Sequence, residues 1–285
     1  MEFKSAKELL TLCKEHDMPI SAVMRTRECT LGETDEAGVD ARMARAWDIM
    51  RTSAHEPLTT PLRSMGGLIG GESRKLNEHC AASRSILGPV LARATAYAMA
   101  VLEVNASMGL IVAAPTAGSA GVVPGVLLAL QEERGFSDET MIRTLFNAGA
   151  VGYLAMRNAT VAGAVGGCQA EVGVAAAMAA SAAVELLDGT PEQCLDAATT
   201  VLMNMLGLVC DPVGGLVEYP CQNRNAAGAA NALVAAELAL SGVRQHIPFD
   251  KMLETMYAVG RRMPAELRET ALGGCAACGV YTISS

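Results

Sequence analysis

The sequence predicts an all-α protein, a single helical domain with glycine-rich loops between its helices. Hydrophobic residues make up 51% of the chain but aromatic residues only 4%. The apolar mass is therefore alanine, valine, leucine and methionine, without the aromatic enrichment that is typical of strands. No stretch alternates apolar and polar residues with the period of two that a half-buried strand shows.

The first part of the chain predicts an outer helical layer, residues 1–58, that belongs to the same domain as a core over residues 59–285. We expect a short helix over residues 5–16, a polar stretch over residues 25–35 and a longer helix over residues 36–52. These segments hold much of the charge, which is typical of a solvated layer.

Several helix ends carry capping residues. Gly135 is placed to end one helix, and Ser137, followed by two acidic residues, opens the next. Thr190 with Pro191 and Gln193 has the form of a capping box with proline in the first turn. Further helices are expected over residues 89–107, from just after 168 to about 189, from 190 to about 207, and over 226–241 and 248–268.

Charge and apolar runs exclude some classes of function. The net charge is −8 and no basic stripe is present, which argues against nucleic-acid binding. The uncharged run over residues 104–131 contains Pro115, Pro124 and several glycines, so a buried segment fits it better than a membrane span. The N-terminus shows no signal-peptide core, and nine cysteines without such a signal indicate thiols or metal ligands in the cytoplasm.

Three cysteines lie in polar junctions at predicted helix ends. Cys168 follows two glycines and precedes a helix, whose N-terminal dipole favours a thiolate, while Cys210 and Cys221 have prolines nearby at Pro212 and Pro220. Their spacing matches neither a zinc pattern nor a ferredoxin pattern. Buried core thiols are the alternative interpretation. The remaining cysteines outside the tail, taken as structural or incidental, are Cys13, Cys29, Cys80 and Cys194.

We interpret the three thiols as ligands of an iron–sulfur cluster. Three protein thiolates on a four-iron cluster leave one iron without a protein ligand. An open iron is a Lewis acid that can polarise a hydroxyl group and a carboxylate, which favours dehydration over electron transfer.

Two glycine-rich loops, residues 64–71 and 116–121, predict anion-binding sites. Their backbone N–H groups are unobstructed, and hydroxyl groups accompany them. Close helix packing over glycine is the alternative. Neither loop has the P-loop pattern or follows a strand, so a carboxylate is a better ligand than a nucleotide. The candidate substrate-binding residues are Ser64, Gly66, Gly67, Thr116, Ala117, Gly118 and Ser119.

With these motifs, the sequence resembles the α subunit of iron–sulfur-dependent L-serine dehydratase, an L-serine ammonia-lyase. The resemblance covers nearly the whole chain, and the stretches that carry it are residues 64–71, 115–121, 166–173, 207–218 and 220–225.

The resemblance implies an all-helical catalytic unit with a [4Fe–4S] cluster on Cys168, Cys210 and Cys221. It implies conversion of L-serine to pyruvate and ammonia without pyridoxal phosphate. It also implies a separate β subunit, and hence a hetero-oligomer, because the chain starts directly at the catalytic part. The C-x-x-C of Cys275 and Cys278 departs from the expected pattern; one of these thiols is expected to cap the open iron until serine displaces it.

Lys75, just after the first glycine loop, is the candidate general base or the partner of the substrate carboxylate. His55 and His79 are weaker candidates, and the base can also belong to the partner chain. Three rival functions stay open: L-cysteine desulfidation on the same scaffold, a non-catalytic iron–sulfur redox sensor, and a zinc-stabilised helical module.

Overall fold

The computed structural model describes residues 1–281 and confirms the all-α prediction. Within these residues the only β-type contact is an isolated bridge between Cys210 and Arg268. The helices are α1 (Ala6–His16), α2 (Ile20–Leu31), α3 (Glu36–Thr59), α4 (Glu72–Ala81), α5 (Pro89–Ala106), α6 (Val122–Arg134), α7 (Asp138–Asn158), α8 (Gly163–Gly166), α9 (Val174–Leu186), α10 (Pro191–Asn204), α11 (Cys221–Leu240) and α12 (Phe249–Arg262).

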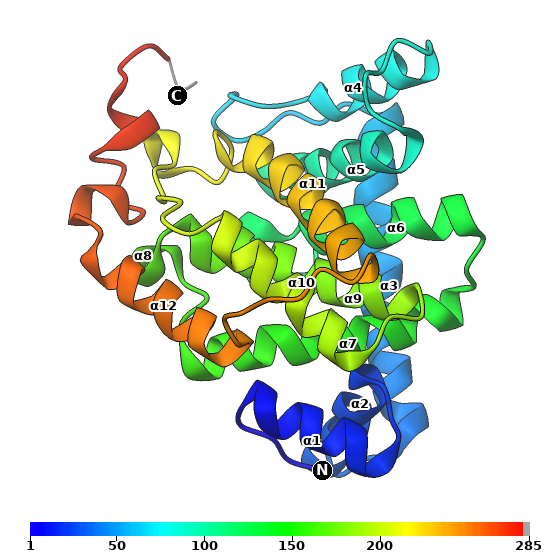
Figure 1. The fold of residues 1–285 in the computed structure, drawn as a ribbon. Helices are drawn as coiled ribbons and strands as arrows, with labels where there is room; N and C mark the ends of the chain where they lie inside the picture. The colour runs from blue at the N-terminus through cyan, green and yellow to red at the C-terminus, as the bar shows by residue number, and fades with distance from the viewer. Residues whose placement is uncertain (282–285) are drawn as a thin grey trace.

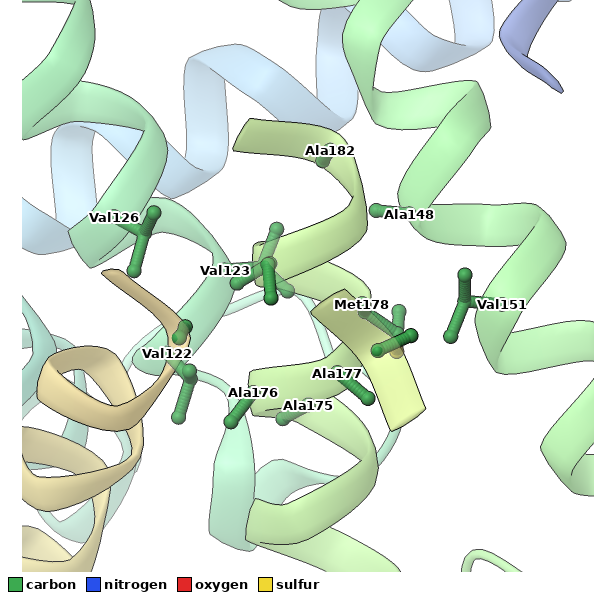
Figure 2. Packing of buried hydrophobic residues seen from close by; sticks show 14 of the residues in the cluster. Val122, Val123, Val126, Ala148, Val151, Ala175, Ala176, Ala177, Met178 and Ala182 are labelled. Atoms are coloured by element: carbon green, nitrogen blue, oxygen red, sulfur yellow. The ribbon is translucent and has the colours of Figure 1, made fainter. Parts of the chain in front are cut away.

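Helix α9 lies at the centre of the fold, in contact with α6, α7, α10 and α11 (Figure 1). Every residue of α9 except Glu185 is buried. Figure 2 shows why the neighbours approach closely: α9 presents mainly alanine side chains towards the valines of α6 and α7. Small side chains allow close helix packing at interior density. The low aromatic content of the sequence thus corresponds to a tightly packed alanine-rich centre.

The predicted helix caps are present. The hydroxyl of Ser137 accepts a hydrogen bond from the Thr140 N–H at 3.2 Å, and Gly135 ends α6 in the left-handed conformation with a φ of 71°. Thr190 and Gln193 form the reciprocal capping box at the start of α10. These boundaries are local properties of the chain.

Some predicted boundaries were wrong. The stretch over residues 25–35 is helical as far as Leu31, because α2 buries Val23 and Met24 and lays the Arg27 guanidinium 3.8 Å from the centre of the Tyr153 ring. Helix α3 continues to Thr59, with Pro57 tolerated near its end. Helix α11 begins five residues earlier than predicted, and α12 ends at residue 262, before a proline.

The first three helices share one hydrophobic core with the rest of the chain. Phe3, Leu9 and Trp47 are buried in the same cluster as α9. The predicted boundary after residue 58 falls in the last turn of α3, and the end of the predicted core, residues 282–285, lies outside the described residues. No helix within residues 1–281 has the length and apolar character needed to cross a membrane.

Candidate active site

Cys168 lies where α8 passes into the long central helix. A single π-helical turn, residues 169–173, follows it directly and continues into α9. Such turns are frequent at functional sites because they shift side chains off the regular helical register. The Cys168 side chain is only 3% exposed.

Cys210 and Cys221 reach the same region from other elements. Cys210 lies in the loop after α10, where its N–H donates to the Leu267 carbonyl at 2.9 Å and its own carbonyl accepts from the Glu269 N–H at 2.6 Å. Cys221 is the first residue of α11. Both thiols are buried, so the structure places all three predicted ligands at helix ends or loops in the interior.

The three thiols are close enough for the charge of one to raise the pKa of another. Burial raises the pKa of the Cys168 thiol to about 12, as it does that of Cys221. The pKa of Cys210 is raised by burial and then by the charges of Glu171, Cys168 and Cys221. The structure therefore brings Cys168, Cys210 and Cys221 into one buried group.

The other buried cysteines lie apart from this group. Burial and then the charge of Glu185 raise the pKa values of Cys13 and Cys194, and the Cys194 sulfur is 3.8 Å from the Asn147 amide nitrogen. Cys29 and Cys80 are half-buried. Within residues 1–281, no three His, Cys, Asp or Glu side chains are arranged to hold a single metal ion.

Glu171 joins the thiols to the second glycine loop. Its carboxylate accepts a hydrogen bond from the Thr116 hydroxyl at 2.9 Å and one from the Cys210 thiol at 3.4 Å. Burial raises the pKa of Glu171. A Cβ atom at position 163 would lie 2.4 Å from the Glu171 Oε2 and 2.9 Å from the Cys210 Sγ, so any larger residue than glycine there would displace these two side chains.

The loop of residues 116–119 leaves two backbone donors free. Residues 117–119 form a short 3₁₀ turn, and the buried Ser119 hydroxyl lies 3.2 Å from that of Thr116. Among the described residues, the N–H groups of Ala117 and Gly118 have no hydrogen-bond acceptor. Two adjacent free N–H groups beside a hydroxyl suit a carboxylate.

The loop of residues 64–71 does hold a carboxylate, and it comes from the chain itself. Glu218, which is 2% exposed, accepts hydrogen bonds from the Ser64 hydroxyl at 2.7 Å, the Gly66 N–H at 2.6 Å and the Leu68 N–H at 3.0 Å. Gly67 adopts a φ of 72° in the same turn. Glu218 thus occupies the donors of Ser64 and Gly66 that were predicted for the substrate, while the Gly67 N–H donates to the Ser64 carbonyl at 3.3 Å.

Two amide side chains tie the cysteine segments together. Gln169 donates to the Gly166 and Met256 carbonyls at 2.8 Å each and accepts from the Gly207 N–H at 2.8 Å. It thereby links the Cys168 turn to the loop that leads to Cys210.

Asn225 makes the corresponding link for the third cysteine. It accepts from the Gly121 N–H at 3.0 Å and donates to the Gly118 and Cys221 carbonyls at 2.8 and 2.9 Å. The loop of residues 116–121 and the start of α11 are therefore held in register.

Lys75 is on the surface of α4. Its side chain is 76% exposed, and the ammonium group lies 3.9 Å from a carboxylate oxygen of Glu72. Beneath it, Glu103 accepts hydrogen bonds from the Ser73 N–H at 2.9 Å and from the Gln222 amide at 3.0 Å. Within residues 1–281 three buried atoms of this group have no partner: Ser73 Oγ, Glu103 Oε2 and Gln222 Oε1.

The C-terminal turn docks onto a buried ion pair. Arg224 lies 2.7 Å from Asp211 and donates to the Val209 carbonyl at 2.9 Å. Asp211 also accepts from the Cys275 N–H at 2.6 Å, so this turn lies beside residues 213–215 (Figure 1). Cys275 is half-buried and Cys278 is exposed.

Sequence reasoning missed the residues that position the site. Five of the six lie within the stretches that carry the resemblance, but nothing in the sequence showed what any of them would contact. The six are Glu103, Gln169, Glu171, Asp211, Glu218 and Asn225.

Comparisons with known proteins agree with the motifs. The profile of the family described as "Serine dehydratase alpha chain" matches residues 15–276. The "Probable L-serine dehydratase, alpha chain" of Bacillus subtilis is 47% identical over 96% of this chain and 91% of its own. The "L-serine dehydratase, alpha chain" of Peptoniphilus asaccharolyticus is 43% identical over 95% of this chain and 93% of its own. The "L-serine dehydratase" of Streptomyces coelicolor is 39% identical over 96% of this chain but only 60% of its own.

Proposed function

We propose that this chain, which belongs to the serine dehydratase alpha chain family, converts L-serine to pyruvate and ammonia with a [4Fe–4S] cluster and without pyridoxal phosphate. The observation that carries the proposal is the buried group of Cys168, Cys210 and Cys221 beside the loop of residues 116–119.

The residues present fit an iron–sulfur cluster. Such clusters are held by cysteine sulfur, and each thiolate binds its own iron, so the ligands need not meet at one point. Buried thiols with raised pKa values need a cationic group to lose their protons. The charge of Arg224 acts on the Cys168 thiol in the sense that favours the thiolate, which supports an anionic group at this place.

When bound, a cluster with one iron free of protein ligands supplies a Lewis acid that makes hydroxide a better leaving group. In the overall reaction serine loses its α-proton and hydroxyl group as water, and the aminoacrylate tautomerises and is hydrolysed to pyruvate and ammonia. The chain has to bind the carboxylate, orient the hydroxyl group and accept the α-proton.

We assign carboxylate binding first to the loop of residues 116–119. The free N–H groups of Ala117 and Gly118 are its donors, whereas the Thr116 hydroxyl donates to Glu171 and could turn to the substrate only if that bond were given up. Ser64, Gly66 and Gly67 stay a second carboxylate-binding prediction. The donors of Ser64 and Gly66 are available to substrate only when Glu218 releases them, and the Gly67 N–H only when it leaves the Ser64 carbonyl.

Two groups of this chain are candidates for accepting the α-proton. Lys75 was predicted from its position after the glycine loop, but its 76% exposure leaves it in water. Glu171 is favoured by geometry, because it lies between Thr116 and Cys210. A general base contributes about 10²–10⁴ in rate, so Lys75→Met with full turnover and Glu171→Gln with a loss of that size would assign the role to Glu171.

We also propose a separate companion chain and a cytoplasmic hetero-oligomer. The relatives from Bacillus subtilis and Peptoniphilus asaccharolyticus are named alpha chains, whereas the relative from Streptomyces coelicolor has one longer chain. The match covers 60% of that longer chain.

The test is an anaerobic reconstitution with iron and sulfide, followed by a pyruvate assay on L-serine with and without the companion chain. We expect about four irons per chain and pyruvate formation that is lost in Cys168→Ala. An intact cluster that forms no pyruvate with the companion present would contradict the proposed reaction. Faster turnover of L-cysteine than of L-serine would instead favour desulfidation.

A further inference from the structure

The segment between α5 and the loop of residues 116–121 has an unusual backbone. Helix α5 ends at Ala106, and the chain turns through Met108, which has a φ of 64°, with the Gly109 N–H donating to the Val104 carbonyl at 2.8 Å. Residues 109–113 that follow are neither helical nor turned. This segment therefore runs free of regular structure directly into the candidate carboxylate loop.

The backbone of this segment has no partners in the chain. Within residues 1–281, no N–H or carbonyl group of residues 110–113 forms a hydrogen bond. Backbone polar groups of folded proteins are nearly always paired, with protein or with water. The sequence here is Leu-Ile-Val-Ala, which suits a strand. An uncharged stretch with unpaired backbone groups resembles the edge of a sheet and can pair with another chain.

Apolar grooves flank the segment on two sides. One, of about 540 Å³, is lined by Val112 and Ala113 together with Met24, Met43 and Met156. The other, of about 390 Å³, includes Gly109 and Leu110. Leu110 is 68% exposed and Met156 is 62% exposed. Flexible methionine side chains are typical of surfaces that receive apolar residues of a partner.

We propose that residues 109–113 form a docking strand for the companion chain of the enzyme. An extended segment of the companion pairs with the free backbone groups, and its apolar side chains enter the groove of Met24, Met43 and Met156. The inference rests on the proposed function, because that function supplies the companion.

The lengths of the relatives favour the companion chain over a second copy of this chain. The Streptomyces coelicolor relative continues well beyond the matched region, which accounts for 60% of its length, whereas the alpha-chain relatives are matched over 91% and 93%. The docking strand also ends two residues before Thr116, so the companion would brace the loop that is bonded to Glu171.

The test is hydrogen exchange of the full chain, alone and in complex with the companion chain, together with titration calorimetry of variants. We expect the amides of residues 110–113 to exchange at least about tenfold more slowly in the complex. Leu110→Asp and Ala113→Pro should weaken binding at least about tenfold, which corresponds to about 1.4 kcal/mol. Ala113→Pro removes one N–H donor, and Leu110→Asp changes a side chain that is already exposed.

The control is Ile86→Asp, which makes the same kind of change at a residue that is 98% exposed and lines neither groove. It should bind the companion as the wild type does. Unchanged binding of both test variants, or no protection of residues 110–113, would overturn the proposal. So would a wild-type chain that binds no companion, or one that dimerises through this segment when alone. Binding of the companion chain is measured without turnover, so the result can be interpreted even if the chain does not convert L-serine.

Discussion

The outer layer and the cysteine site use their polar groups in different ways. In the outer layer Arg51 pairs with Asp138 at 2.8 Å, with side chains 43% and 48% exposed. At the site Arg224 pairs with Asp211 at 2.7 Å, with side chains 16% and 3% exposed. Exposed pairs are screened by water and contribute little, whereas a buried charge without its partner is strongly unfavourable. The site is therefore the region where single polar residues fix the structure.

The two regions also differ in what they leave unpaired. Among the described residues, the buried polar atoms without partners near the cysteines include Ser73 Oγ, Glu103 Oε2, Gln222 Oε1 and Arg268 Nε. Arg268 forms a β-bridge with Cys210. Gln222 follows Cys221 and, like Ser73, donates to Glu103. The outer layer has Arg27 Nε, on a guanidinium that stacks over Tyr153. Buried polar groups are normally satisfied by protein or ordered water, so the atoms near the cysteines leave hydrogen-bonding capacity there that the described residues do not use.

The largest expected effect separates the clustered thiols from the other buried thiols. Cys210→Ala should abolish pyruvate formation and lower the iron content, because a cluster ligand is lost. Cys194→Ala removes an equally buried thiol and should leave both unchanged. Iron and sulfide analysis together with a turnover assay compares the two variants. Equal effects of Cys210→Ala and Cys194→Ala would show that the clustered thiols do not differ from the other buried thiols.

The buried and exposed ion pairs provide the second test. Arg224→Met should lower the free energy of unfolding by about 3 kcal/mol, because Asp211 is left buried and unpaired. Arg51→Met should lower it by less than about 1 kcal/mol. Denaturant unfolding at fixed salt gives both values. A smaller loss for Arg224→Met than for Arg51→Met would reverse the comparison.

Glu218 provides a third test within the site. Glu218→Gln should lower the free energy of unfolding by about 2 kcal/mol, because glutamine keeps one acceptor oxygen and its NH2 group would face either the Gly66 N–H or the Ser64 and Leu68 donors. Glu2→Gln, at an exposed position, is the control and should leave stability unchanged. Hydrogen exchange should localise the loss to residues 64–71; a loss elsewhere would contradict the role assigned to this carboxylate.

The smallest effect concerns Asp138 of α7, where the outer layer contacts it through Trp47, and it depends on pH. Hydrogen bonds from Gln131 and then from Trp47 lower the pKa of Asp138. A carboxyl group with a lowered folded-state pKa contributes stability above its unfolded pKa, and the contribution is lost as the pH falls through the folded value. Asp138→Asn should therefore lower the melting temperature slightly at about pH 7 and not at about pH 2. A difference that persists in acid would point to lost packing instead.

Local features were predicted well because their causes are local. The caps at Ser137 and Thr190 and the stop at Gly135 depend on side chains within one turn of the helix end. The error at α2 shows where local patterns fail. Arg25 and Arg27 were interpreted as part of a polar stretch, but Arg25 pairs with Asp40 and Arg27 stacks on Tyr153. No local pattern predicts either contact.

The site was predicted in its residue types but not in its contacts. The sequence predicted that residues 64–71 would bind a carboxylate, and the fold places Glu218 there from 150 or more residues away. Likewise Lys75 follows a glycine loop but faces solvent, whereas Glu171 lies beside Cys210. Distances between segments so remote in the chain are set by helix packing, which has no signature in a single sequence.

The sequence by itself determined the helical class, the main helix caps and the three junction cysteines, because each depends on composition or on neighbours a few residues apart. Only the tertiary structure decided which groups meet: Gln169 joins the Cys168 turn to the loop that leads to Cys210, and Asn225 joins the start of α11 at Cys221 to the loop of residues 116–121. These long-range contacts depend on the packing and burial of the whole chain, because they stabilise the protein only once the core has formed.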